Sequence, residues 1–177
     1  RAAQSAPTAE ARRGRWTEAI RLLDRFRRQN PGHPQARVFD FQAAVYLWAR
    51  ARSWQQQEEL DPTDRPAREE AIKDLDAALT RLRALQEGLP PGNNEVLGHN
   101  VRFRLAQALA DRASFDPEGS EARRRREDEA LKILERPLSE PLLRGFAHLL
   151  RAELLGRLGR FDQATEAIDA VAKEKPA

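Results

Sequence analysis

Residues 154–176 read LLGRLGRFDQATEAIDAVAKEKP, and this stretch decides the fold that the sequence predicts. A ladder of small or apolar residues runs through it and ends in a proline: Gly159, Phe161, Ala164, Ile168, Val171 and Pro176. Ala164, Ile168 and Val171 follow one another by four and three residues, so a helix places them on one face. Glycine permits a tight turn and proline stops a helix. The stretch therefore predicts two antiparallel helices joined by a turn at Gly159.

The same ladder, with the same spacing, occurs near the other end of the chain: Gly14, Trp16, Ala19, Leu23, Phe26 and Pro31. This repetition resembles the tetratricopeptide repeat, a helix–turn–helix unit of about 34 residues. The resemblance is specific in the second half of each unit. In the first half of the C-terminal unit, the family's tryptophan, leucine and tyrosine positions hold His148, Arg151 and Leu155. The resemblance implies an all-α fold, a right-handed α-solenoid of about four helical hairpins.

Pro- and Gly-rich breaks between apolar periodic segments set the expected helices. We expect helices over 7–14, 17–29, 34–59, 67–87, 94–113 and 120–135, another that begins at Pro141, and a last one over 162–175. They form one domain over 1–177, with units of roughly 1–31, 34–88, 93–137 and 141–176. Asn93 or Asn94 is the expected N-cap of the fifth helix. In the second helix Leu22, Leu23 and Phe26 are expected to face inward.

Composition limits the function classes. The chain has no cysteine and no methionine, which excludes disulfides and thiolate chemistry and indicates a processed or trimmed chain. No run of about 18 apolar residues is present to cross a membrane. The arginine-rich residues 12–28 could meet an anionic partner, including nucleic acid, or could form a solvated helix face. Residues 121–129, which include four adjacent arginines, have a net charge of zero, which favours local ion pairs there.

The resemblance also implies a binding face. In that family, ligands lie along a concave face lined by the first helix of each hairpin. The matching positions are Phe39, Tyr46 and Arg50 in the second unit, and Asn100, Phe103, Gln107, Asp111, Phe146, Leu149, Glu153 and Arg157 in the third and fourth. Aromatic, amide and charged side chains together suit a peptide or a partner helix. The alternative is that Phe39, Phe103 and Phe146 are core residues.

The leading functional hypothesis is a non-catalytic scaffold or adaptor that binds a protein or peptide. No phosphate loop and no nucleophile–base pair points to an enzyme, and no cofactor is implied. His33, His99 and His148 stand apart, and Glu95 with His99 offers only two of the three or four ligands that a metal needs. The alternative function is a small-molecule or lipid carrier with a pocket lined by Phe39, Tyr46, Trp48 and Phe103. The missing start favours an exported bacterial envelope protein, lipid-anchored or periplasmic, over a cytoplasmic one.

Overall fold

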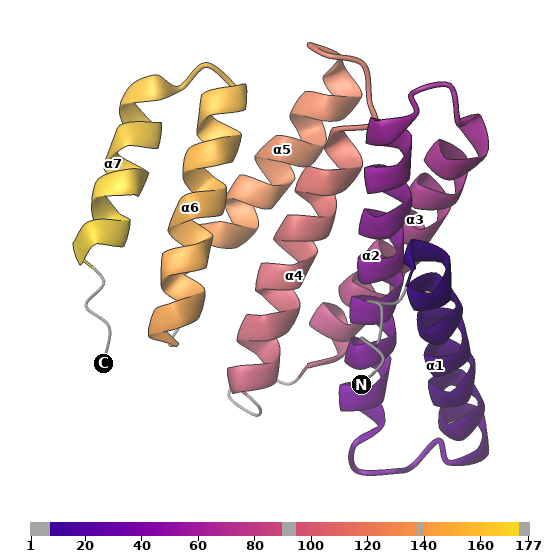
Figure 1. The fold of residues 1–177 in the computed structure, drawn as a ribbon. Helices are drawn as coiled ribbons and strands as arrows, with labels where there is room; N and C mark the ends of the chain where they lie inside the picture. The colour runs from indigo at the N-terminus through magenta and orange to yellow at the C-terminus, as the bar shows by residue number, and fades with distance from the viewer. Residues whose placement is uncertain (1–7, 90–94, 137, 139, 174–177) are drawn as a thin grey trace, which may run out of the picture. The chain divides into compact units, whose positions relative to one another are not determined.

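The computed structural model describes residues 8–89, 95–136, 138 and 140–173. These residues form α-helices and contain no strand (Figure 1), which confirms the all-α prediction. The helices are α1 (Ala9–Gln29), α2 (Ala36–Leu60), α3 (Arg65–Gly88), α4 (Glu95–Ala113), α5 (Glu121–Leu134), α6 (Pro141–Arg157) and α7 (Phe161–Lys173). The chain divides into two compact units, unit 1 (Arg1–Arg81) and unit 2 (Leu82–Ala177). The division falls within α3.

The breaks between helices lie where proline, glycine and capping residues predict them. Ser120 caps α5, because its hydroxyl oxygen accepts a hydrogen bond from the backbone N–H of Arg123 at 3.2 Å. Pro141 opens α6 at its first turn, where a missing N–H has no cost. The predicted cap at Asn93 or Asn94, and the stops at Pro137 and Pro176, lie outside the described residues.

Gly159 makes the turn that the sequence predicts between α6 and α7. Its φ is +72°, a left-handed conformation that favours glycine. The N–H of Arg160 bonds the carbonyl of Leu155 at 2.8 Å, and the N–H of Gly159 bonds that of Gly156 at 3.1 Å. These two bonds close the end of α6 as a Schellman motif, which satisfies carbonyls that the helix end would otherwise leave without partners.

Gly14 makes no such turn, and the prediction of two helices over 7–14 and 17–29 is wrong. Gly14 and Trp16 both lie inside the continuous helix α1. A helix that ended at Gly14 would be too short to offset its own nucleation, whereas continuation adds a hydrogen bond for each residue. The arginines on both sides of Gly14 are good helix formers, which reduces the cost of a glycine in the helix interior. The two ladders of the sequence therefore fold differently at their first position.

Unit 1 packs α1 against α2, and the first part of α3 joins them in a shared core. Ile20, Leu47 and Ala78, one from each helix, form a buried cluster. The expectation that Leu22 and Phe26 face inward is wrong, since both side chains are exposed. The reason is the helical period, because residues two or six positions after Ile20 point away from the face that Ile20 buries.

Unit 2 contains two antiparallel helix pairs, α4 with α5 and α6 with α7, and α6 also contacts α4 and α5 (Figure 1). Its buried core takes residues from each of these helices, including Val101, Leu105, Leu109, Ala130, Leu134, Leu154 and Ala164. In α7 the ladder residue Ile168 is exposed although Ala164 is buried. Helix α7 packs against α6 and buries the side that carries Ala164 and Ala167.

Candidate functional site

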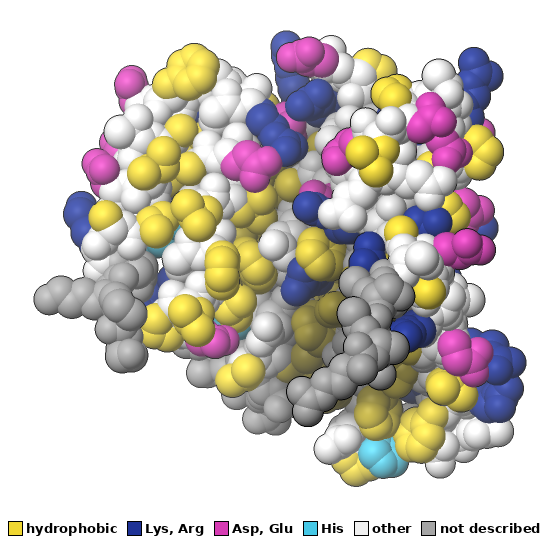
Figure 2. Space-filling view, viewed as in Figure 1, with side chains coloured by type: hydrophobic (Ala, Val, Ile, Leu, Met, Phe, Trp, Pro, Cys, Tyr) yellow, Lys and Arg dark blue, Asp and Glu magenta, His cyan; other side chains and the backbone are white. Residues whose placement is uncertain are grey.

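One face of α6 carries large apolar side chains that the described structure leaves exposed. Leu142, Phe146 and Leu149 are 69%, 55% and 50% exposed. They follow one another by four and three residues, so they form a single stripe along the helix. Hydrophobic side chains are also plainly visible over α6 and α7 in the space-filling view (Figure 2). A contiguous exposed apolar stripe is unusual on a protein surface and commonly marks a binding face.

Helix α4 lies beside this stripe and contributes a buried aromatic side chain, Phe103, that packs beneath it. Phe103 is only 6% exposed, and its ring centroid is 6.4 Å from that of Phe146. Phe103 is therefore a core residue, which is the alternative that the sequence analysis gave for it. The ring of Phe146 packs near Phe103 but remains partly exposed to solvent. We define the α4–α6 surface by its members on the two helices, which lie beside the buried ring of Phe103: Asn100, Gln107, Leu142, Phe146, Leu149 and Glu153.

The amide side chains of this surface differ in their hydrogen bonding. Asn100 donates from Nδ2 to the carbonyl of Val96 at 2.8 Å, so part of its capacity serves its own helix. Gln107 has a buried Oε1 without a hydrogen-bond partner among the described residues. Such an acceptor carries a free-energy cost within the protein, and its burial separates it from a partner on the surface. Asp111, one turn further along α4, is half-buried.

Arg157 stands at the far end of the α6 stripe and links three helices. Its guanidinium donates to the carboxylate of Glu153, one turn before it, and to the carbonyl of Ala110 on α4 at 3.4 Å. It also lies 4.0 Å from Oε1 of Glu127, a buried carboxylate of α5 that Arg123 contacts at 3.1 Å. Arg157 thus helps to neutralise the buried carboxylate of Glu127 inside unit 2. Its guanidinium already has partners within the chain before any protein or peptide binds.

In unit 1, Arg50 is held in an internal ion pair. Its guanidinium donates two hydrogen bonds to the carboxylate of Asp74, at 2.6 and 2.7 Å, and a third to the hydroxyl of Thr17 at 2.7 Å. The bonds to Asp74 raise the pKa of Arg50, against the opposing effect of burial. Arg50 therefore ties α1, α2 and α3 together, and its expected role in partner binding stays a prediction.

The aromatic residues expected to bind in unit 1 belong to two different environments. Tyr46 packs against the buried cluster of Ile20, Leu47 and Ala78. Phe39 lies in the first turn of α2, where its ring meets that of Phe26 edge-on with the ring centroids 5.1 Å apart. Beside these two rings is an apolar hollow of about 410 Å³ on the surface of α1 and α2.

The arginines of residues 12–28 are partly engaged within unit 1. Arg13 stacks on the ring of Trp54 at 3.8 Å, and Arg27 pairs with Asp40 at 2.9 Å. These contacts favour the interpretation of a solvated helix face over an anion-binding surface. The run of arginines in α5 behaves in the same way, since Arg123 pairs with Glu127 and Arg126 pairs with Asp116.

Sequence reasoning missed Leu142 as a member of the binding stripe. The signal was present, because Leu142, Phe146 and Leu149 repeat by four and three residues directly after Pro141. The family pattern, which begins one turn later, excluded it. Glu95 belongs to the metal-ligand pair considered above, but its side chain lies outside the described residues. No three His, Asp or Glu side chains of the described chain lie close enough together to hold a metal ion.

In the part of the chain that the structure describes, no helix is both long and apolar enough to span a bilayer. Comparison with protein-family models, with curated protein sequences and with solved structures finds no match to this chain.

Proposed function

We propose that this chain is a non-catalytic scaffold of helical hairpins that binds a protein or peptide partner on its α4–α6 surface. The observation that carries the proposal is the stripe of Leu142, Phe146 and Leu149, which stays exposed beside the buried ring of Phe103. The successive pairs α4–α5 and α6–α7 support a solenoid of the tetratricopeptide type.

The chemistry of the surface favours a partner segment with apolar anchors. Phe146 and Leu149 offer apolar area that a partner removes from water, at about 25 cal/mol for each Å². Asn100, on the neighbouring helix, provides an amide oxygen that accepts a hydrogen bond from a peptide backbone. An amphipathic helix with residues repeated at three- and four-residue steps matches a stripe with that same repeat.

The test is selection of binding peptides from a displayed random library, with two matched variants. Phe146→Ser removes the centre of the stripe. Phe161→Ser removes an equally large, exposed side chain from α7, outside the α4–α6 surface. Both variants should remain folded, because both side chains are largely exposed, and thermal unfolding by circular dichroism checks this.

We expect the selected peptides to carry spaced apolar residues and to bind the Phe161→Ser variant as they bind the wild-type chain. They should bind the Phe146→Ser variant about 10- to 100-fold more weakly, the loss typical of an aromatic anchor of roughly 1.5–3 kcal/mol. Equal affinity for both variants, or a library that yields no binders, would refute the proposal.

A second candidate function rests on the apolar hollow of unit 1. Its volume of about 410 Å³, beside Phe26 and Phe39, lies in the range of about 300–1,000 Å³ that small-molecule sites occupy. This hollow supports a carrier of small apolar molecules, the alternative function that the sequence also raised. Only one of the residues predicted to line such a pocket, Phe39, lines this hollow, and Tyr46, Trp48 and Phe103 do not. Quenching or enhancement of an apolar fluorescent probe, lost in Phe39→Ala, would favour it, and an unchanged signal would dismiss it.

A further inference from the structure

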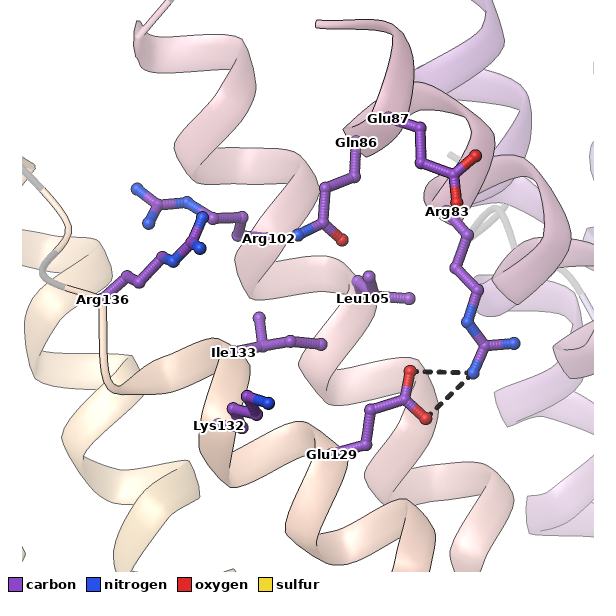
Figure 3. A pocket seen from close by; sticks show the side chains of 9 residues that line it. All are labelled: Arg83, Gln86, Glu87, Arg102, Leu105, Glu129, Lys132, Ile133 and Arg136. Carbon is purple, nitrogen blue, oxygen red and sulfur yellow. Dashed lines mark hydrogen bonds and ion pairs between the residues drawn. The ribbon is translucent and has the colours of Figure 1, made fainter. Parts of the chain in front are cut away.

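Unit 2 contains a cleft whose lining is dominated by cations. The cleft measures about 550 Å³ and lies between the end of α3, α4 and the C-terminal end of α5 (Figure 3). Its charged side chains are Arg83, Glu87, Arg102, Glu129, Lys132 and Arg136. Leu105 and Ile133 provide apolar lining between them. The cationic side chains outnumber the carboxylates by two, which makes the cleft a place of positive potential.

One of the two carboxylates is already neutralised. Arg83 donates to both oxygens of Glu129, at 2.9 and 3.1 Å, on the side of the cleft that α3 and α5 form. The rest of the charged lining consists of Arg102, Lys132, Arg136 and one further carboxylate, Glu87. The positive charge is therefore concentrated at the side where α4 meets the end of α5.

Arg102 and Arg136 extend toward one another from different elements, and Figure 3 shows their guanidinium groups side by side. Burial and, secondarily, the charge of Arg136 lower the pKa of Arg102. The C-terminal carbonyls of α5 account for cations at Lys132 and Arg136. Arg102 reaches the same cleft from α4. Arg102 is half-buried and Arg136 is exposed. An anion between two neighbouring guanidinium groups accepts charge-assisted hydrogen bonds from both and offsets their mutual repulsion.

We propose that this cleft binds a phosphate monoester, with its dianion held between the guanidinium groups of Arg102 and Arg136. A phosphate monoester carries a charge of about −1.5 to −2 at pH 7 and has three acceptor oxygens. It therefore matches two guanidinium forks better than a single carboxylate does. The cleft is larger than a phosphate group, and Leu105 and Ile133 offer an apolar surface for the esterified part. This inference stands independently of the α4–α6 surface.

The first measurement titrates inorganic phosphate, with acetate as the monoanionic control, while NMR follows the arginine side-chain signals. Arg102→Gln combined with Arg136→Gln removes the proposed site. Arg124→Gln combined with Arg125→Gln makes the same charge change at exposed positions of α5. Arg102→Lys combined with Arg136→Lys keeps both charges without the guanidinium forks, so it preserves the test if the Gln pair fails to fold.

We expect phosphate to bind at least about tenfold more tightly than acetate, both to the wild-type chain and to the Arg124/Arg125 variant. The Gln pair at 102 and 136 should lose at least about tenfold in phosphate affinity, and the Lys pair should fall between. Equal phosphate affinity in all variants, or no preference for phosphate over acetate, would overturn the proposal.

Two further ligands identify the source of the phosphate. One is a phosphoserine peptide and the other is a small ester such as phenyl phosphate. Tighter binding of the peptide assigns the cleft to a phosphorylated protein, and equal or tighter binding of the small ester assigns it to a free phosphorylated molecule. Failure of both to compete with inorganic phosphate would contradict a monoester site. None of these results depends on Phe146, so the outcome is separable from that of the proposed function.

Discussion

Asp74→Asn should destabilise unit 1 more than any surface charge change does. The carboxylate of Asp74 accepts hydrogen bonds from Arg50 at 2.6 and 2.7 Å. The side chain of Asp74 is 2% exposed and that of Arg50 is 18% exposed, so water replaces these bonds only in part. Asparagine has nearly the same shape, so the substitution removes the charge and leaves the packing intact.

The expected loss follows from the position of the pair. Removal of one partner from a fully buried ion pair costs about 3–5 kcal/mol, because a charge is left buried without compensation. The guanidinium of Arg50 stays ionised at neutral pH, but it keeps its bond to Thr17 at 2.7 Å and part of its contact with water. We therefore expect a loss of about 2–3 kcal/mol. Glu18→Gln, which breaks an exposed pair with Arg21, serves as the matched control.

The assay is urea unfolding followed by tryptophan fluorescence, which reports unit 1 because Trp16, Trp48 and Trp54 all lie in it. With a urea dependence of about 1–3 kcal/mol per molar, the Asp74→Asn midpoint should fall by about 0.7–3 M. The Glu18→Gln midpoint should stay within error of the wild-type chain, because exposed ion pairs contribute little. Equal midpoints for the two variants would refute the reasoning that Asp74 and Arg50 hold unit 1 together.

Three other predictions follow from single residues. Gly159→Ala should cost about 1–2 kcal/mol, since φ is +72° there, whereas Gly14→Ala should stabilise helix α1 by about 0.5–1 kcal/mol; thermal unfolding by circular dichroism compares them. Leu154→Ala should cost about 2–5 kcal/mol, because it leaves a cavity in the core of unit 2, and an unchanged unfolding midpoint would contradict its burial. Hydrogen bonds from the hydroxyl and the N–H of Thr63 lower the pKa of Asp61. They therefore stabilise the fold at neutral pH, and this contribution is lost as the pH falls through the lowered pKa. Thr63→Ala should raise the pKa of Asp61 toward the ordinary value, which an NMR titration measures.

Much of the secondary structure could be predicted from local chemistry. Proline, glycine and capping residues mark the ends of helices, and Gly159 and Pro141 lie where they were expected because their conformational limits act within a few residues. Gly14 shows the limit of that reasoning. A glycine at the expected position of the repeat pattern forms a turn only if the segment before it is long enough to form a stable helix of its own.

The faces of the helices were less predictable, because they depend on which neighbour is present. Leu22 and Ile168 fit an apolar pattern, yet both are exposed since no described helix covers them. Arg50 fits a ligand-lining position of the family, but Asp74, distant in sequence, takes up its guanidinium. A periodic pattern gives the direction of a side chain relative to its own helix and not the partner that it meets there.

The most direct test of the central claim is site-specific photo-crosslinking of a selected peptide to the α4–α6 surface. Phe146 is replaced by a photoreactive phenylalanine analogue in one sample, and Phe161 in another, because both side chains are large and exposed. Binding on the α4–α6 surface predicts one discrete adduct from position 146 and none from position 161. Adducts of equal yield at the two positions, or an adduct only at position 161, would contradict it.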